Sequence, residues 1–360
     1  MIAGGGTAGH VNPAVALAEA LVGDQVSFIG TARGAEARIV PGAGFPLDEI
    51  EVAGFDRARP WSFPRTAGKA AGAVMSARSL IRAQRPQVVV GMGGYVSLPA
   101  SLAAASLRIP VVLHEQNIVF GLAHRVSKPF ARKVAVSFEE TLAVAGSKGV
   151  FVGNPVARRF VDFDREQRRT QALQAFGLEP HRRTLLVFGG SQGAQRVNSA
   201  AAGLAELWRD RADLQVLHIT GSAAFEEVRT TVGAPDGKLL YRVIEFVEDM
   251  TEAYAAADLA VCRGGASTWA EITVVGLPAI IVPYPYHRDR QQEKHGRVAE
   301  RHGAAVVLDD SAATALSIAE IATPLLADHA KLEAMAANAK GLGRPDAAER
   351  LAEVVRQAAR

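Results

Sequence analysis

A regular alternation of short apolar runs with longer helical patterns constrains this chain most, because several runs end directly in glycine-rich loops. The runs are rich in Val, Ile and Leu and are mostly continuous rather than alternating in polarity. Such strands, separated by helices, are typical of parallel sheets that are covered on both faces. The predicted strands span residues 25–29, 88–90, 111–113, 133–136, 184–188, 214–219, 259–262, 279–282 and 305–308.

The length of 360 residues allows two such α/β domains, each with its own core. We predict a first doubly wound domain at residues 1–156 and a second at residues 157–340, because a Gly-Asn-Pro turn and a charged segment separate the two strand patterns. A final amphipathic helix at residues 341–360 is expected to pack back toward the first domain.

Bulk composition indicates a globular protein, with 49% hydrophobic and 21% charged residues. The single cysteine, Cys262, excludes an internal disulfide and fits a reducing compartment. We find neither a secretion leader nor an apolar run of the roughly 20 residues that span a bilayer. A cytosolic location is therefore expected.

Positive charge is concentrated in the first half of the chain. Residues 1–150 hold 15 Lys/Arg and 10 Asp/Glu, whereas the remaining residues hold 25 and 27. No acidic residue lies between Asp56 and Glu115. The basic residues in that interval are Arg57, Arg59, Arg65, Lys69, Arg78, Arg82, Arg85 and Arg108. We therefore expect this half to meet an anionic partner.

The first glycine-rich loop is GGGTAGH, at residues 4–10. Glycines cost backbone entropy but let the main chain approach a phosphate, and free N–H groups at a helix start attract negative charge. His10 ends this loop and is our candidate general base, because histidine titrates near the working pH. Its alternative role is to hydrogen-bond the loop or a substrate. His114 and Glu115 are candidates for an acceptor site.

Two further loops follow predicted strands, GGSQG at residues 189–193 and CRGGAST at residues 262–268. The former lacks the Lys-Ser/Thr ending of a P-loop and the spacing of the dinucleotide fingerprint. After the latter, Ser267 or Thr268 is expected to cap a helix. Glu271, expected in the first turn, could cap free amides or accept hydrogen bonds from a sugar diol.

Nine motifs together resemble the MurG family, the bacterial transferases that add N-acetylglucosamine to the undecaprenyl-diphospho-muramoyl peptide lipid in peptidoglycan synthesis. Over residues 2–310 they read, in order, GGGTAGH, GMGGYVSLPA, HEQN, VGNPV, GGSQGAQ, EFVEDM, CRGGAST followed by AEI, GLPAIIVPYP and RDRQQ. The resemblance implies a GT-B fold, in which two Rossmann-like domains face a cleft. It also places the nucleotide sugar mostly on the second domain and the acceptor on the first.

The resemblance further implies which residues bind UDP-N-acetylglucosamine. In the second domain these would be Ser191 at the diphosphate, Val247 at the uracil, Ala266, Ser267 and Thr268 at a phosphate, Glu271 at the ribose, and Gln291 and Gln292 at the N-acetylglucosamine ring. In the first domain Thr7, Ala8, Gly9 and Asn117 would close on the same donor.

Three departures from the family pattern stand out. Ala8 replaces a usual glycine, and Ala157 replaces the arginine that follows GNPV. We take Arg158, in preference to Arg159, as the phosphate-facing arginine. The short segment before the first loop suggests a clipped or misassigned start or a weakened edge strand.

The implied reaction inverts the anomeric carbon, and glycine loops with helix N-termini would stabilise the leaving diphosphate. The sequence Asp162-Phe163-Asp164 matches a metal-binding signature but lies away from every glycine loop. We therefore expect transfer without a metal or cofactor.

The basic region from Arg57 to Arg85, in which Trp61 and Phe63 are interleaved, suits an anionic membrane surface. A solvated helix face is the alternative. We expect peripheral docking on the cytoplasmic face of the cell membrane and no nucleic-acid partner, since no nucleic-acid module is recognised. Alternative functions are another lipid-linked sugar transferase, a UDP-N-acetylglucosamine 2-epimerase or a non-catalytic nucleotide-sugar-binding adaptor.

Overall fold

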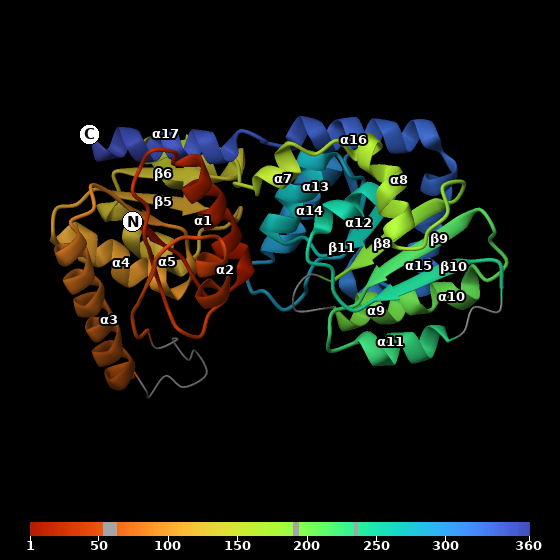
Figure 1. The fold of residues 1–360 in the computed structure, drawn as a ribbon, viewed down its shortest axis with the longest axis horizontal. Coiled ribbons are helices and arrows are strands. Elements are labelled where there is room, and N and C mark those ends of the chain that lie inside the picture. Colours follow the sequence, from red (N-terminus) through yellow and green to blue (C-terminus); the bar gives the residue numbers. More distant parts are fainter. Residues whose placement is uncertain (53–62, 190–193, 234–236) are drawn as a thin grey trace. The chain divides into compact units, whose positions relative to one another are not determined.

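The computed structural model describes residues 1–52, 63–189, 194–233 and 237–360, and for residues 63–70 it describes the backbone. The chain forms two compact units (Figure 1). The first comprises Met1–Ala157 together with Arg344–Arg360, and the second comprises Arg158–Gly343. Each unit contains one parallel sheet with helices around it, so the predicted class of two doubly wound α/β domains is confirmed.

The sheet of the first unit has seven parallel strands in the order β3-β2-β1-β4-β5-β6-β7. The strands are β1 (Ile2–Ala3), β2 (Phe28–Gly30), β3 (Leu47–Glu49), β4 (Val89–Gly91), β5 (Val111–Glu115), β6 (Lys133–Val136) and β7 (Gly149–Phe151). The expectation of a weakened edge strand at the start is wrong, because β1 pairs with β2 on one side and β4 on the other. Two residues suffice there because Ile2 and Ala3 are completely buried in the sheet.

Helices of the first unit pack on both faces of this sheet (Figure 1). They are α1 (Ala8–Ala20), α2 (Glu36–Gly42), α3 (Phe63–Gln84), α4 (Gly94–Ser106), α5 (Leu122–Ser127), α6 (Leu142–Ala145) and α17 (Ala347–Ala359), with short 3₁₀ turns η2 (Lys128–Phe130), η3 (Glu139–Thr141) and η4 (Gly146–Lys148). The last helix, α17, contacts α1, β5 and β6 and contributes Leu351 and Val355 to the core of this unit.

The second unit has six parallel strands in the order β10-β9-β8-β11-β12-β13. The strands are β8 (Arg183–Phe188), β9 (Leu214–Ile219), β10 (Leu240–Ile244), β11 (Leu259–Cys262), β12 (Ala279–Ile281) and β13 (Ala305–Val307). The helices are α7 (Arg158–Val161), α8 (Arg165–Ala175), α9 (Gln195–Ala202), α10 (Leu204–Leu207), α11 (Phe225–Val232), α12 (Met250–Ala256), α13 (Ala266–Val275), α14 (Gln291–Arg301), α15 (Ala315–Ala327) and α16 (His329–Leu342), with the 3₁₀ turn η5 (Asp310–Ala312).

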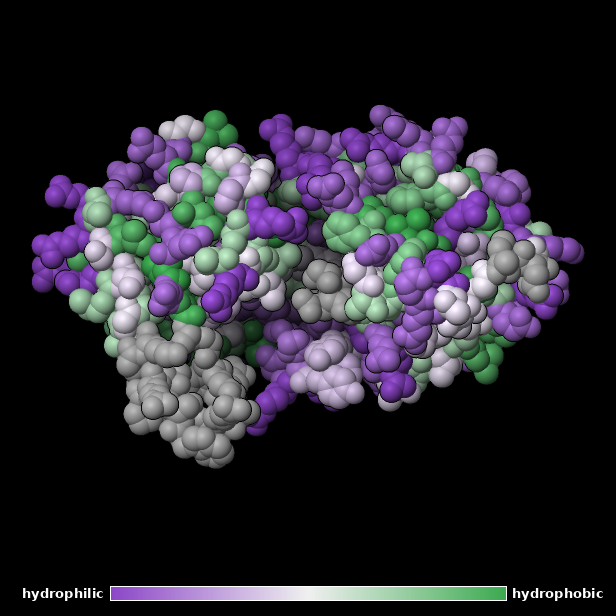
Figure 2. All heavy atoms as spheres, turned by 60° about the horizontal axis from the view of Figure 1, so that its bottom comes forward, coloured by the Kyte–Doolittle hydropathy of each residue, from purple (hydrophilic) through white to green (hydrophobic). Residues whose placement is uncertain are grey.

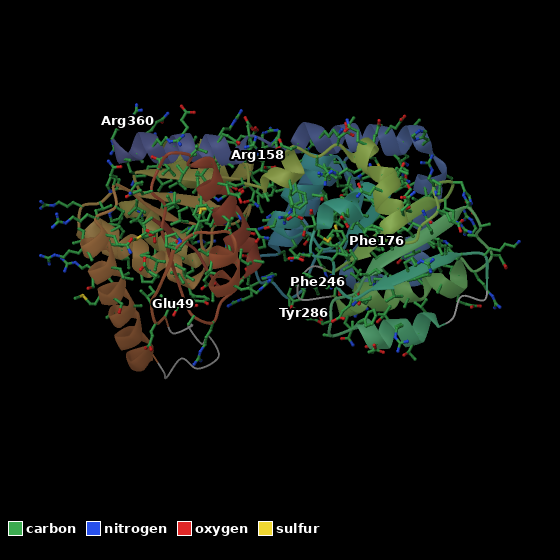
Figure 3. The ribbon with its side chains drawn as sticks, in the orientation of Figure 1. Glu49, Arg158, Phe176, Phe246, Tyr286 and Arg360 are labelled. Carbon is green, nitrogen blue, oxygen red and sulfur yellow. The ribbon has the colours of Figure 1, made fainter. Side chains whose placement is uncertain are left out.

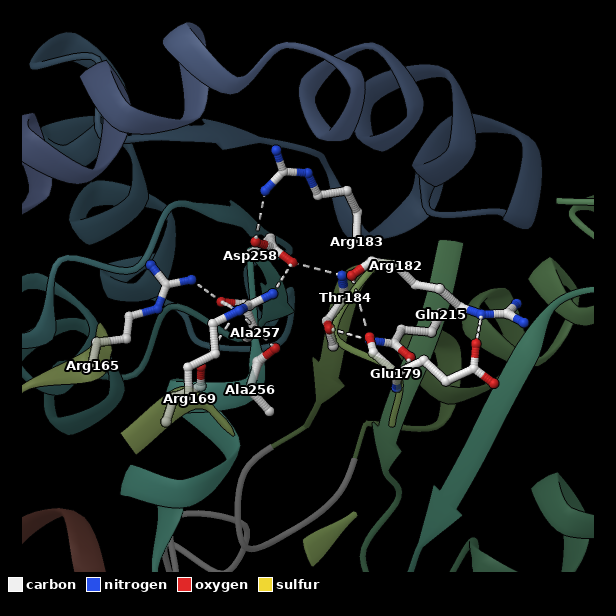
Figure 4. A network of polar contacts seen from close by, with 11 residues as sticks. Arg165, Arg169, Glu179, Arg182, Arg183, Thr184, Gln215, Ala256, Ala257 and Asp258 are labelled. Atoms are coloured by element: carbon white, nitrogen blue, oxygen red, sulfur yellow. Dashed lines mark hydrogen bonds and ion pairs between the residues drawn. The ribbon is translucent and has the colours of Figure 1, made fainter. Parts of the chain in front are cut away.

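The buried carboxylate of Asp258 connects the amino-terminal ends of the central strands β8 and β11 in the second unit (Figure 4). It accepts a 2.7 Å hydrogen bond from the Thr184 backbone N–H in β8. Arg169 of α8 pairs with it at 2.9 Å and Arg183 at 3.3 Å. Arg165 also donates to the carbonyl of Ala257. This network lies at the start of β8 and β11, so it stabilises the fold at the end opposite the glycine loops.

Candidate active site

The carboxyl ends of three adjacent strands define one candidate site in the first unit, because ligands of parallel α/β sheets bind at that edge. Strand β1 leads into the loop before α1, β4 into Met92 and Gly93, and β5 into Gln116 and Asn117. These strands are neighbours in the sheet, so residues from three distant parts of the sequence meet there.

The first glycine loop is wrapped around a buried carboxylate that no sequence pattern predicted. Glu36, at the start of α2, is completely buried. Its Oε2 accepts a 2.8 Å hydrogen bond from the Gly6 N–H, while its Oε1 accepts bonds from the N–H and hydroxyl of Thr31 at 3.1 and 2.8 Å. A Cβ on Gly5 would lie only 2.5 Å from Oε1. The protein's own carboxylate therefore occupies one amide of this loop and requires glycine beside it.

Helix α1 starts directly after this loop. Thr7 is the exposed N-cap residue and makes no side-chain capping bond, and Ala8 begins the helix. The first N–H groups of a helix have no partner within it and attract anions. Of the residues predicted to contact the donor from the first unit, Thr7 is thus the N-cap of α1, and Ala8 and half-buried Gly9 lie in its first turn with His10.

Two histidines, His10 and His124, lie close together near this helix start, and each is hydrogen-bonded to a different side chain. Nδ1 of half-buried His10 is 2.5 Å from Oε1 of Gln116. Nδ1 of His124 is 2.8 Å from Oε2 of Glu115. Burial lowers the pKa of His10 despite its hydrogen bond to Gln116, so its imidazole is neutral near pH 7. His10 is the more accessible of the two rings, because only 2% of His124 is exposed.

Glu115 organises the turn that follows β5 and is itself buried. Its Oε1 accepts from the N–H and side-chain amide of Asn117 at 3.0 and 3.3 Å, and its Oε2 from the Gly121 N–H at 2.9 Å. Burial alone would raise the pKa of Glu115, but His124 and these backbone donors lower it to about 2. Together with the complete burial of His114, this makes both residues interior supports, whereas Asn117 is half-buried at the edge.

In the second unit, α13 starts directly after β11 and the glycine pair. The prediction that Ser267 or Thr268 caps this helix is wrong: Gly265 is the N-cap residue and no side chain caps it. Glycine at that position adds no side-chain oxygen, so the first-turn amides of Ala266, Ser267 and Thr268 depend on other partners. These three residues are half-buried, as an anion-binding helix start requires.

Glu271 lies in the second turn of α13 rather than the first, so it does not cap the helix. Its Oε2 accepts a 2.8 Å hydrogen bond from the phenol of Tyr254 in α12. Burial raises the pKa of Glu271 to about 7, against the lowering effects of Tyr254 and Arg159. Sequence patterns gave no role to Tyr254, because an apolar helix position is normally core.

The loop between β10 and α12 carries Val247, which is half-buried. Asp249 caps α12 by accepting from the Thr251 N–H at 3.0 Å. Arg159 pairs with Asp249 at 3.3 Å and lies close enough to Glu271 to influence its pKa. Arg158, labelled in Figure 3, is instead 85% exposed at its side chain and pairs with Asp162 at 3.0 Å. The structure therefore brings Arg159, not Arg158, to the other donor-site candidates of this unit.

Gln291 and Gln292 form the first turn of α14 and are half-buried. Oε1 of Gln292 accepts a 2.9 Å hydrogen bond from the Tyr284 N–H. The backbone of Gln292 also packs closely against Gly264, where a Cβ would lie 2.5 Å from the Gln292 carbonyl oxygen, so this position requires glycine. The start of α14 is thereby held against the end of β11, beside the start of α13. Tyr286, from the same loop, is 78% exposed (Figure 3).

Two predicted features remain. Ser191 lies outside the described residues. The two aspartates of the metal signature are engaged locally, since Asp162 pairs with Arg158 and Asp164 caps α8 through the N–H groups of Glu166 and Gln167. Among the residues that the structure describes, no group of three or more His, Cys, Asp or Glu side chains could hold a metal ion.

Comparisons with known proteins identify the family. Residues 1–136 match the glycosyltransferase family 28 N-terminal domain and residues 184–351 the glycosyltransferase family 28 C-terminal domain. The crystal structure of Acinetobacter baumannii MurG is 28% identical, with a TM-score of 0.78 over 99% of this chain and 98% of that one. A Halothermothrix orenii protein named UDP-N-acetylglucosamine--N-acetylmuramyl-(pentapeptide) pyrophosphoryl-undecaprenol N-acetylglucosamine transferase is 38% identical over 99% of this chain and 98% of its own length. The chain belongs to the MurG family.

Membership of the MurG family confirms the resemblance and the GT-B class expected from the motifs. A UDP-GlcNAc 2-epimerase from Neisseria meningitidis also superimposes, with a TM-score of 0.70 over 99% of this chain and 98% of that one. Its sequence identity is only 14%, so that likeness concerns the fold alone.

Proposed function

We propose that this protein transfers N-acetylglucosamine from UDP-N-acetylglucosamine to the 4-hydroxyl of the muramoyl sugar in undecaprenyl-diphospho-muramoyl-pentapeptide. The observation that carries the proposal is the full-length match to relatives named for this reaction. The acceptor oxygen forms a bond to the anomeric carbon as the bond to UDP breaks, so the configuration inverts.

The second unit binds the donor in this proposal. The start of α13 holds phosphate with Ala266, Ser267 and Thr268, because the positive end of the helix dipole favours negative charge there. Glu271 accepts hydrogen bonds from the ribose hydroxyls through Oε1, since Tyr254 occupies Oε2. Gln291 and Gln292 read the amino sugar, Val247 meets the uracil, and Ser191 touches the diphosphate.

The first unit supplies the acceptor site and the base. Thr7, Ala8, Gly9 and Asn117 close on the donor from their own edge of the sheet, and His10 accepts the proton of the attacking hydroxyl. His10 suits this role because its ring is neutral near pH 7 and half-buried at the helix start. Helix-terminal amides and Arg159 offset the charge of the leaving diphosphate, so the reaction proceeds without a metal.

Docking on an anionic membrane through residues 57–85 brings the enzyme to its lipid-linked acceptor. Arg57, Arg59 and Trp61 lie outside the described residues, as do the side chains of Phe63 and Arg65. In the described part of α3, Met75 is 60% exposed and Arg82 is exposed, as is Arg85 directly after the helix. On the first unit, Figure 2 shows apolar side chains lying between hydrophilic ones, the mixture that suits a lipid headgroup surface. Within the described residues, no helix combines the length and apolar character needed to cross a bilayer.

The test is turnover of UDP-N-acetylglucosamine with and without a lipid-linked muramoyl-pentapeptide. We expect UDP release only with the acceptor, formation of the disaccharide lipid, and activity that survives a strong chelator. Release without the acceptor, or formation of UDP-N-acetylmannosamine, would contradict the proposal and point to an epimerase. Donor binding without any release would indicate a non-catalytic adaptor.

A further inference from the structure

We propose that Gln116 is a positioning residue that holds His10 in the tautomer protonated at Nδ1, so that Nε2 offers its lone pair to the acceptor hydroxyl. The inference rests on the proposed transferase function, in which His10 is the base. It adds a residue with a defined role, because the tautomer decides which ring nitrogen can take a proton.

The orientation of the Gln116 side chain is fixed by its surroundings. Gln116 follows β5 directly and is 1% exposed. Its Nε2 donates a 2.8 Å hydrogen bond to the carbonyl of Met92, which follows β4. If the amide were rotated by half a turn, Oε1 would face that carbonyl, and two acceptors would lie at hydrogen-bond distance. Oε1 therefore points to His10.

This orientation sets the proton on the imidazole. Nδ1 of His10 is 2.5 Å from Oε1, an atom with no proton to donate, so Nδ1 must be the donor. A neutral imidazole carries one proton, and burial keeps this ring neutral near pH 7. Nε2 is consequently the unprotonated nitrogen.

Neighbouring groups preserve this arrangement. Gly93 has a φ of +93°, and a Cβ there would lie 3.0 Å from Nδ1 of His10 and 3.5 Å from Cε1 of His124. Only glycine lets the chain after β4 pass between the two rings at that backbone angle. The titratable groups that act on His10 are Glu115 and His124. His124 is bonded to Glu115, so neither competes with Gln116 for Nδ1 of His10.

The proton balance is complete with these groups. As the acceptor oxygen bonds to the anomeric carbon, its proton moves to Nε2 of His10, and the electron pair of the broken bond leaves with UDP. The resulting imidazolium keeps its Nδ1 proton in the bond to Gln116, whose amide oxygen stabilises the positive charge. The proton on Nε2 then returns to solvent.

The first test reads the tautomer directly, by long-range ¹⁵N–¹H correlation spectra of protein with ¹⁵N-labelled histidine. The sequence has nine histidines, so the His10 signals are assigned by their loss in His10→Gln. We expect Nδ1 protonated in the wild type and a mixture of tautomers in Gln116→Met. A wild-type spectrum with the proton on Nε2 would overturn the inference.

The second test compares kcat with KM. Gln116→Met should lower kcat about 10- to 100-fold, less than the roughly 100- to 10,000-fold contribution of general base catalysis because His10 itself remains, and should leave the donor KM within about twofold. Gln116→Glu keeps an acceptor toward Nδ1 and should retain more activity than Gln116→Met. Gln215→Met removes another fully buried amide, in the second unit, and serves as the matched control whose kcat stays unchanged.

The outcomes separate this inference from the proposed function. Unaltered kcat in His10→Gln would remove His10 as the base, whatever its tautomer. Loss of kcat in His10→Gln, with wild-type kcat and tautomer in Gln116→Met, would refute the role of Gln116 alone.

Discussion

The phenol of Tyr254 donates a 2.8 Å hydrogen bond to Oε2 of Glu271 and thereby joins α12 to α13. Tyr254 is completely buried, with its ring 6.0 Å from that of Phe160 and 5.8 Å from that of Phe188. A side chain packed in this way has one orientation, so it fixes the rotamer of the half-buried carboxylate. The carboxylate proposed to bind ribose is therefore held from inside the core.

Tyr254→Phe tests this support, because it removes the hydroxyl and keeps the ring. We expect the donor KM to rise about tenfold, the effect of losing about 1.5 kcal/mol from a charged hydrogen bond, while the acceptor KM is unchanged. The measurement is steady-state kinetics with each substrate varied in turn. Equal changes in both KM values would show that the substitution perturbs the fold rather than the donor site.

Titration of Glu271 should make donor binding depend on pH, because its pKa is raised to about 7. Only the ionised carboxylate can accept hydrogen bonds from both ribose hydroxyls, so donor KM should increase as the pH falls through 7. Binding near that pH should release a proton, which calorimetry in buffers of different ionisation enthalpy detects. Glu271→Gln should raise the donor KM and abolish this release, and a proton release that persists in the variant would assign it elsewhere.

The same titration affects stability. Since the folded pKa of Glu271 lies above its ordinary value of 4.5, its contribution is complete below pH 4.5 and is lost as the pH rises through 7. The melting temperature of Glu271→Gln relative to that of the wild type should therefore rise between about pH 5 and pH 8, because only the wild type acquires a buried charge over that range. A constant difference across that range would contradict the raised pKa.

Glu36→Gln should disturb the first glycine loop, because one oxygen that accepts from Gly6 or Thr31 becomes an N–H donor facing donors. We expect a loss of about 1–3 kcal/mol of unfolding free energy and a lower kcat/KM. Urea unfolding and initial rates measure the two effects. Glu49→Gln changes an exposed glutamate of the same unit (Figure 3) and should alter neither. Similar behaviour of the two variants would exclude a special role for Glu36.

Asp258→Asn should destabilise the second unit without changing kcat under folded conditions. The substitution leaves Arg169 and Arg183 without their buried carboxylate, at a cost of about 2–4 kcal/mol. Asp213→Asn breaks the exposed pair with Arg211 and should cost less than about 1 kcal/mol. Urea denaturation of both variants makes the comparison, and equal losses would mean that the buried network has no particular weight.

Arg82→Glu combined with Arg85→Glu should weaken association with anionic vesicles about tenfold or more, since each cation near such a surface contributes about 1 kcal/mol. Arg78 is left unchanged because it donates to Ser106 and is half-buried. Reversal of Arg209 and Arg229, in the second unit, provides a control of equal charge. Cosedimentation should show binding that falls with added salt. Salt-independent binding, or equal effects of the two double variants, would argue against docking through α3.

Apart from β1, which was expected only as a weakened edge strand, the interior strands of both sheets could be predicted because they are mostly apolar runs, as at 111–113 and 259–262. The strands that escaped prediction, β3, β7 and β10, all lie at sheet edges. Edge strands are covered on fewer sides, so their sequences need not be continuously apolar. In β3, for example, no residue is fully buried.

The sequence predicted several candidate residues of the site but not the hydrogen bonds between them. Glycine loops and the family motifs gave His10, Asn117 and Glu271 as candidates, while Gln116 stood in a recognised motif without a role. Tyr254 and Glu36 were missed because their significance depends on a partner that is distant in sequence or hidden under a turn. No periodicity encodes such pairings.

The sequence by itself determined the class of fold, the order of the loops and the membership of the family, because these follow from local patterns along the chain. Only the tertiary structure decided which carboxylate fills the first glycine loop, which arginine lies near Glu271 and which nitrogen of His10 bears a proton. Those outcomes depend on strand order in the sheets, which brings β1, β4 and β5 together and sets the hydrogen-bond partners of side chains that are more than a hundred residues apart, as His10 and Gln116 are.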